Sequence, residues 1–296
     1  MTGSIRFPHL GITFEHVIRG ITIGDFTIAC YGIIIAIAMV TGIFLVMKVA
    51  DATGQNGEIY FDLAITAVIT AVICARIYYV VFSWDYYREH LREILNLRQG
   101  GLAIYGGVLG GAAAVCIFCK FKNMQCLKAL DTAVIGLVWG QVVGRWGNFF
   151  NREAFGEYTD NLFAMQIPVS DVRLSEITVK MQEHLVETSG GTYIQVHPTF
   201  LYESLWNLAV LFVLLAVTVI VKKRFEGLIL LLYMVLYGSG RFWIEGLRTD
   251  QLLIPGTELP VSQVLSGVLV VTAASVLIIK IYLYKRKTRL SIVEKV

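Results

Sequence analysis

A cluster of polar side chains stands at the end of an apolar segment, in the stretch 144–156. Its five members are Arg145, Asn148, Asn151, Arg152 and Glu153. Polar groups near hydrocarbon are costly unless they face a polar cavity, so the cluster predicts a functional site. Arginine offers a planar fork of donors for a phosphate, asparagine both donates and accepts, and a carboxylate can take a proton. The alternative is that Arg145 extends to the membrane surface and the glycines only permit close helix packing.

A second polar stretch begins at Tyr237. Arg241 and Glu245 stand four residues apart, so on a helix they share one face and can pair. An ion pair within the helix would by itself lower the cost of burying both groups. We favour a joint role, in which Glu245 holds the Arg241 guanidinium while its free edge meets a ligand. Arg248 and Asp250 follow closely.

Glycines surround a tyrosine at the start of another apolar run. Tyr105 is followed by Gly106 and Gly107, which would let another backbone or a lipid approach closely. A tyrosine at the membrane interface is more often an anchor than a catalyst. At the start of a later apolar run Pro198 or Thr199 can begin a helix, and we interpret His197 and Glu203 there as structural.

The composition is that of a membrane protein. Hydrophobic residues make up 56% of the 296, the mean hydropathy is +0.67, and 16% of residues are charged, against about 25% in soluble domains. The 22 acids and 25 bases cannot easily cover the surface of a soluble protein of this length. A net charge of +3, with scattered bases, argues against nucleic-acid binding.

The five cysteines lie within or beside apolar segments, which argues against a disulfide framework. Cys116, Cys119 and Cys126 have part of the spacing of a metal site, but no fourth ligand lies nearby in the sequence. We therefore expect buried free thiols and no metal.

Apolar runs of about 20 residues predict seven membrane-spanning helices in an all-α polytopic protein. Their expected ranges are 26–47, 59–82, 102–119, 130–150, 198–221, 227–246 and 261–284. Residues 1–296 are expected to form a single integral membrane domain. Seven spans put the termini on opposite sides, and every lysine except Lys180 falls on one side. The positive-inside rule then predicts the N-terminus outside and the C-terminus in the cytoplasm.

Two polar segments interrupt the spans on the outer side. Residues 151–197, between the fourth and fifth helices, are expected to form a small extracytoplasmic head. The shorter segment 84–100 mixes aromatic residues with arginines, which predicts a helix lying at the membrane surface. In this topology the fourth and sixth helices both end outside, so Arg145 and Arg241 should lie at similar depth.

The motif Gly-Arg-x-Gly-Asn-Phe-x-Asn-x-Glu-x-x-Gly at 144–156 resembles the signature of the prolipoprotein diacylglyceryl transferases, bacterial membrane enzymes that begin lipoprotein maturation. The similarity extends over nearly the whole chain, in the same order and spacing. It includes Tyr31-Gly32, Gly106-Gly107, His197-Pro198 with Leu201-Tyr202-Glu203, and Tyr237 through Glu245.

The resemblance implies a seven-helix fold with a small head, in the bacterial cytoplasmic membrane, with the active site toward the outer face. It implies transfer of the diacylglyceryl group of phosphatidylglycerol to the lipobox cysteine thiol of a prolipoprotein signal peptide. A thioether forms and glycerol phosphate leaves. The expected partners are these two substrates and membrane lipids, with no nucleic acid and no cofactor.

By position, the family's important residues fall on Tyr31, Arg145, Asn148, Glu153, Gly156, Tyr237, Arg241 and Glu245. With the other candidates above, the residues expected to be catalytic are Arg145, Asn148, Glu153, Arg241, Tyr105 and Tyr31. Those expected to bind substrate are Arg145, Arg241, Glu245, Tyr237, Gly156, Asn151, Gly106 and Gly107.

One departure concerns proton transfer. Many members of the family carry a histidine before the paired glycines, where this sequence has Tyr105. A phenol is a poorer proton acceptor than an imidazole at neutral pH. Glu153, Tyr105 and water are therefore all candidates for taking the thiol proton.

Two other functional classes are compatible with the arginines. A channel or transporter for an anionic solute would line a pore with Arg145 and Arg241 and place polar residues along both halves of the membrane. Here the charge within the predicted spans gathers toward the outer side. A lipid-binding scaffold without enzymatic activity would need the arginines but neither Glu153 nor Asn148.

Overall fold

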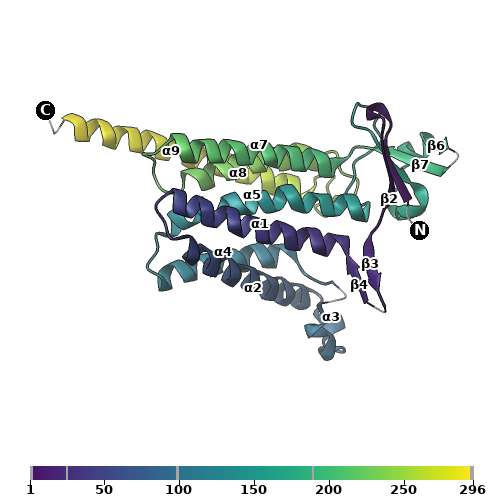
Figure 1. Ribbon diagram of the computed structural model, residues 1–296, viewed down its shortest axis with the longest axis horizontal. Coiled ribbons are helices and arrows are strands. Elements are labelled where there is room, and N and C mark those ends of the chain that lie inside the picture. The colour runs from purple at the N-terminus through teal and green to yellow at the C-terminus, as the bar shows by residue number, and fades with distance from the viewer. Residues whose placement is uncertain (1–2, 25, 98–99, 189, 294–296) are drawn as a thin grey trace. The chain divides into compact units, whose positions relative to one another are not determined.

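The computed structural model describes residues 3–24, 26–97, 100–188 and 190–293. Over these residues seven helices are long and apolar enough to cross a membrane, as the sequence predicts (Figure 1). They are α1 (Cys30–Ala52), α2 (Gly57–Phe82), α4 (Ile104–Phe121), α5 (Cys126–Asn151), α7 (Thr199–Ile220), α8 (Leu228–Glu245) and α9 (Val261–Val293). Helix α9 continues past its predicted end at residue 284 into the basic segment that follows the apolar run.

The chain divides into two compact units. The first comprises Met1–Gly42 and Leu137–Val296, and the second comprises Ile43–Gly136. The division passes through α1 and α5, so each of these helices begins in one unit and ends in the other. In the first unit α7 and α9 both pack against α8.

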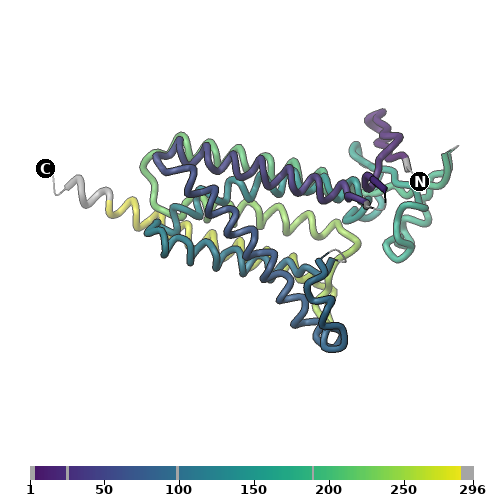
Figure 2. The backbone as a smooth tube through the Cα atoms, turned by 60° about the horizontal axis from the view of Figure 1, so that its bottom comes forward, coloured from purple at the N-terminus to yellow at the C-terminus, as the bar shows by residue number. Residues whose placement is uncertain are grey.

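A small antiparallel sheet belongs to the first unit. Its strands, in spatial order over the described residues, are β2 (Ile12–Val17), β1 (Gly3–Phe7), β5 (Met165–Pro168), β7 (Gly191–Val196) and β6 (Val186–Thr188). Figure 2 shows the N-terminal residues, in purple, and the teal residues after α5 lying together beyond one end of α7. The sheet core contains Ile5, Ile167 and Ile194, which are completely buried.

This sheet corrects one expectation. The all-α prediction holds for the long helices and is wrong for the strands, which also include the hairpin of β3 (Gly20–Ile23) and β4 (Phe26–Ala29). The sheet also extends beyond the predicted head at 151–197, because β1 and β2 come from the N-terminus. These strands have four to six residues, so a prediction based on apolar runs of about 20 residues does not detect them. The first spanning helix accordingly begins at Cys30, after β4, rather than at residue 26. That residues 1–296 form a single membrane domain stays a prediction.

Short helical turns complete the first unit. They are η1 (Pro8–Leu10), η4 (Val169–Asp171), η5 (Leu174–Glu176) and α6 (Val179–Glu183). The side chain of Thr178 caps α6 by accepting a hydrogen bond from the amide of Met181 at 3.2 Å.

In the second unit, α2 and α4 pack closely because glycines line the contact. A Cβ atom on Gly106 would lie 2.5 Å from the Tyr78 Cβ, and one on Gly110 would lie 2.3 Å from the Cys74 Cβ. Both spacings are too short for any side chain, so the two helices can approach only at glycine.

The segment 84–100 forms two short turns, α3 (Trp84–Tyr87) and η2 (Leu91–Leu95), rather than the single interfacial helix predicted. The buried Arg76 guanidinium accounts for the break. It donates to the carbonyls of Glu93, Ile94, Asn96, Gly100 and Gly101, at 2.7 to 3.2 Å. In a continuous helix these carbonyls would point along the helix axis toward backbone amides. Because they point toward one guanidinium instead, the segment does not form a continuous helix. Residues 98 and 99 of the predicted helix lie outside the described residues.

Candidate active site

A buried glutamate of α7 joins two arginines from different helices. Glu203 is 4% exposed. Its Oε2 lies 2.6 Å from Nη2 of Arg145 on α5, and its Oε1 lies 3.1 Å from Nη1 of Arg241 on α8. The two arginines predicted to lie at similar depth are therefore neighbours. One carboxylate fixes both guanidiniums at the ends of α5 and α8.

The start of α7 is tied to the chain that leaves α5, and this sets the position of Glu203. The hydroxyl of Thr199, the first residue of α7, donates to the carbonyl of Ala154. Glu203 follows one helical turn later, on the same face as Thr199. Ser204 adds a second tie by donating to the carbonyl of Val142 on α5 at 2.9 Å.

Arg241 also pairs within its own helix, as the sequence predicts. Its Nη2 lies 2.5 Å from Oε2 of Glu245, which is buried. Two carboxylates thus hold the two terminal nitrogens of Arg241. Arg145 differs, because among the described residues it pairs with no carboxylate besides Glu203. The other edge of the Arg145 guanidinium is left for a ligand.

A third arginine joins the cluster from the loop after α8. Nη1 of Arg248 lies 3.8 Å from Oε1 of Glu203, while Nε and Nη2 bind both oxygens of Asp250 at 2.9 and 2.7 Å. Burial lowers the pKa of Arg248, but the hydrogen bonds and charge of Asp250 outweigh it, so the pKa is raised overall. Burial raises the pKa of Asp250, and the bonds from Arg248 reverse this shift. Both groups are charged at neutral pH.

The cluster is balanced in charge. Its three guanidiniums belong to Arg145, Arg241 and Arg248, and its three carboxylates to Glu203, Glu245 and Asp250. Pairing of this kind offsets the desolvation of each ion and keeps the arginines in fixed orientations. A ligand at this cluster would therefore meet positioned donors rather than a large excess of positive charge.

Two asparagines hold a further carboxylate just past the end of α5. Nδ2 of Asn148 and Nδ2 of Asn151 donate to Oε1 of Glu153 at 3.0 and 3.2 Å. The chain reverses here through left-handed residues, Arg152 (φ 54°) and Ala154 (φ 56°). The amides of Asn148 and Asn151 thus orient the Glu153 carboxylate just after the end of α5.

Close backbone approaches explain two glycines of the motif. A Cβ on Gly147 would lie 2.5 Å from the Tyr31 ring, so Tyr31 packs directly on α5. A Cβ on Gly156 would lie 2.7 Å from the carbonyl oxygen of Leu247. Gly156 also forms an isolated β-bridge with Arg248, which joins the chain after α5 to the chain after α8.

His197 borders this junction. The amide of Gly156 donates to the His197 carbonyl at 2.9 Å. Burial lowers the pKa of the imidazole, the charge of Lys180 lowers it further, and Glu157 opposes both. The imidazole therefore stays neutral over a wider range of pH than a solvated histidine.

The remaining candidates are Tyr237 on α8 and three residues of α4. Tyr237 stacks on Tyr233, with ring centroids 5.2 Å apart, one turn before Arg241 on α8. Tyr105, Gly106 and Gly107 lie on α4 in the second unit. The packing of α4 on α2 gives Gly106 a structural reason, whereas a Cβ on Gly107 would lie at an ordinary contact distance of 3.6 Å from the Ala71 carbonyl oxygen.

The interpretation of Glu203 as structural does not include its contacts with Arg145 and Arg241. A carboxylate inside an apolar segment is itself a signal of function. Arg248 and Asp250 have no predicted role, because their pairing depends on the turn that follows α8.

The structure assigns no metal site or disulfide to the cysteines. Among the described residues no group of His, Cys, Asp or Glu side chains could hold a metal ion. All five cysteines are free thiols. Cys30 and Cys119 are buried, whereas Cys116 is exposed, so the expectation of burial holds for only some of them.

Comparison with known proteins gives a consistent result. The family model described as prolipoprotein diacylglyceryl transferase matches residues 19–279. The phosphatidylglycerol–prolipoprotein diacylglyceryl transferase of Geobacillus kaustophilus is 39% identical over 258 residues, covering 87% of this chain and 90% of the relative. The enzyme of the same name from Acaryochloris marina is 42% identical over 244 residues, covering 82% and 83%. That of Clostridioides difficile is 38% identical over 265 residues, covering 90% and 94%.

Proposed function

This chain belongs to the prolipoprotein diacylglyceryl transferase family, and we propose that its arginine–carboxylate cluster is where it acts on phosphatidylglycerol. The chain is a multi-pass membrane enzyme that transfers a diacylglyceryl group from phosphatidylglycerol to prolipoproteins. The observation that carries the site assignment is the pairing of Arg145 and Arg241 on the single buried carboxylate of Glu203.

The reaction is a displacement at the glycerol carbon that bears the phosphate. The thiol sulfur of the lipobox cysteine attacks this carbon, a C–S bond forms and the C–O bond to phosphate breaks. Glycerol phosphate leaves with the electron pair, and the thiol proton passes to a base. No residue of the enzyme becomes covalently modified, and no cofactor takes part in these bond changes.

The arginines bind the phosphate and stabilise it as it departs. Glu203 and Glu245 hold the two guanidiniums in advance, so little reorganisation is needed when charge develops on the leaving oxygen. The edge of Arg145 turned away from Glu203 supplies donors in the fork geometry that suits phosphate. Arg248 supports the cluster through its contact with Glu203.

Glu153 is the candidate base that lies in the same unit as the arginines. Its position between Asn148 and Asn151 supports a role in proton transfer, because the two amides orient the carboxylate. Tyr31 and Gly156 shape the surroundings through their close packing. Tyr105, with Gly106 and Gly107, lies in the other unit, and Tyr105 and water stay alternatives to Glu153 as the base.

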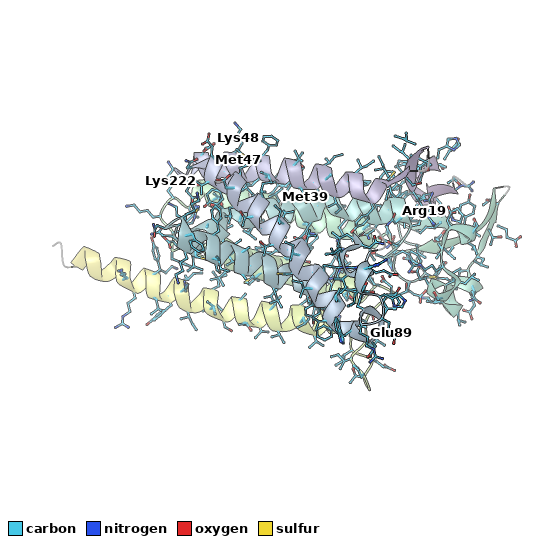
Figure 3. The ribbon with its side chains drawn as sticks, turned by 90° about the horizontal axis from the view of Figure 1, so that it is seen from below. Arg19, Met39, Met47, Lys48, Glu89 and Lys222 are labelled. Atoms are coloured by element: carbon cyan, nitrogen blue, oxygen red, sulfur yellow. The ribbon has the colours of Figure 1, made fainter. Side chains whose placement is uncertain are left out.

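For the topology, we propose that the N-terminus lies outside and the C-terminus in the cytoplasm of the bacterial plasma membrane. In the first unit, Lys222 and Arg19 lie at opposite ends of the helices (Figure 3). Lys222, with its basic neighbours, marks the cytoplasmic end by the positive-inside rule. The sheet and the arginine cluster then face outward, where a prolipoprotein signal peptide would present its cysteine.

One assay tests the assignment. The purified protein in detergent is incubated with labelled phosphatidylglycerol and a lipobox peptide, and formation of the thioether is measured. We expect product with the wild-type chain and little with Arg241→Ala. Full transfer by Arg241→Ala would refute the phosphate-binding role. Lipid binding without thioether would indicate a scaffold, and ion flux in liposomes without thioether would indicate a channel.

A further inference from the structure

A polar cavity adjoins the amide-held carboxylate in the first unit. It has a volume of about 310 Å³ and lies among the end of α5, Arg19 between β2 and β3, and the turns η4 and η5. Val172 is the one apolar residue among the described side chains that line it. A cavity with this lining suits a small, strongly polar ligand rather than an acyl chain.

The lining carries three arginines, Arg19, Arg152 and Arg173, and three acids, Glu153, Asp171 and Glu176. Nε of the buried Arg152 lies 3.0 Å from the Asp171 carboxylate, and Arg19 donates to the Asp171 backbone carbonyl. Among the described residues no carboxylate forms an ion pair with Arg19. Burial lowers the pKa of Arg152, Asp171 opposes this, and the nearby charge of Arg19 lowers it further. Arg173, 81% exposed, lies on the lining and pairs with Glu176 at a long 3.6 Å.

Glu153 supplies a hydrogen-bond acceptor to the lining of the cavity. Both amide hydrogen bonds to this residue end on Oε1, from Asn148 and Asn151. Within the described part of the chain, Oε2 accepts no side-chain hydrogen bond. Because Glu153 lines the cavity, this oxygen can accept from a ligand hydroxyl. The cavity thus combines arginine side chains with a hydrogen-bond acceptor.

We infer that this cavity binds the glycerol phosphate released by the reaction, with the phosphate at Arg19 and Arg173 and the glycerol hydroxyls at Glu153. The inference rests on the proposed function, which makes glycerol phosphate the leaving group. The product carries a phosphate monoester and two adjacent hydroxyls, and the charged and accepting sides match these groups. Asn148 lies one turn from Arg145 on α5 and binds Glu153, which links the lining of the cavity to the helix that carries Arg145.

The same glycerophosphate chemistry also occurs in the headgroup of intact phosphatidylglycerol. If the released product occupies the cavity after C–O cleavage, free glycerol phosphate inhibits the enzyme. If the headgroup of the intact lipid occupies the cavity, the cavity contributes to the affinity for phosphatidylglycerol. Measuring the inhibition constant and KM separately distinguishes the two sources.

The test uses the full-length protein in detergent, with phosphatidylglycerol and a lipobox peptide as substrates. The inhibition constant for glycerol phosphate is measured for the wild type, Arg19→Gln and Arg173→Gln. Arg88→Gln is the matched control, because Arg88 is exposed and does not line the cavity. Equilibrium dialysis with labelled glycerol phosphate measures binding without any turnover. The Arg173 side chain is largely exposed, so we expect Arg173→Gln to fold. This variant therefore keeps the test valid if Arg19→Gln fails to fold.

We expect a rise of about tenfold in the inhibition and dissociation constants of both cavity variants, as suits loss of one charge-assisted contact, and no change in Arg88→Gln. An unchanged KM for phosphatidylglycerol assigns the cavity to the released product, and a parallel rise assigns it to the headgroup as well. Equal constants in all four proteins would overturn the inference. If thioether forms normally in that case, the proposed function stands; if no thioether forms at all, the proposed function fails on its own assay.

Discussion

Replacing Glu203 with glutamine tests whether one buried carboxylate positions the arginines. Glutamine has nearly the same shape and keeps an acceptor oxygen, but it removes the negative charge between Arg145 and Arg241. Arg241 retains Glu245 as a partner. Arg145 loses the carboxylate that holds it, so its guanidinium becomes free to turn toward solvent.

The structure sets the size of the effect. Removing one partner from a buried ion pair costs about 3–5 kcal/mol. Because Glu245 still holds Arg241 and the Arg145 side chain is 22% exposed, we expect the lower end, about 3 kcal/mol. For a protein of this size that corresponds to a fall in Tm of roughly 5 °C. Loss of one positioned donor to a developing oxyanion lowers kcat by about a hundredfold or more.

The measurements are thermal unfolding in detergent and the kcat and KM of diacylglyceryl transfer. Glu89→Gln serves as the control, since its side chain is 69% exposed and its contact with Arg88 is a long 3.8 Å. Glu203→Asp should recover part of the activity because it restores the charge at a shorter reach. Wild-type kcat and Tm in Glu203→Gln would refute the positioning role.

Four further results are expected. Asn148→Ala removes one of two amide donors to Glu153 and should lower kcat by roughly tenfold to a hundredfold while the protein stays folded, as judged by its Tm. Glu153→Gln should lower kcat by about a hundredfold or more if this residue takes the thiol proton, whereas Tyr105→Phe should leave kcat unchanged; the opposite pattern would make the phenol the base. Gly147→Ala should destabilise the protein by about 1–3 kcal/mol in thermal unfolding, because its methyl group would overlap a tyrosine ring at 2.5 Å. The lowered pKa of His197 means that the unfolded chain binds a proton more readily, so stability should fall as pH drops through about 6.5 toward the folded-state pKa; His197→Gln should flatten this part of the pH–Tm curve.

The parts of the site that could be predicted are local in sequence. The pairing of Arg241 with Glu245 follows from helical spacing alone, and the structure confirms it. The seven apolar helices follow from the length of the apolar runs. Both inferences need only the geometry of one helix.

The parts that could not be predicted depend on contacts between distant segments. Glu203 contacts both Arg145 and Arg241, and the three residues lie on three separate helices. The sheet also depends on contacts between distant segments, because Arg6 of β1 pairs with Gln166 of β5 far along the chain. Periodicity says which face of an element is polar, but not which partner that face will meet.

The neutrality of the arginine cluster bears on the choice of base. During the displacement the phosphate changes from one negative charge to two, while the thiol releases one proton. A carboxylate that accepts this proton loses one negative charge, so the charge enclosed by the site stays constant through the step. A neutral phenol cannot do this, because it must itself be deprotonated before it can accept. In a region shielded from water a change of net charge is costly. Charge conservation therefore favours Glu153, which two asparagines already hold in the same unit as the arginines, over Tyr105 as the acceptor of the thiol proton.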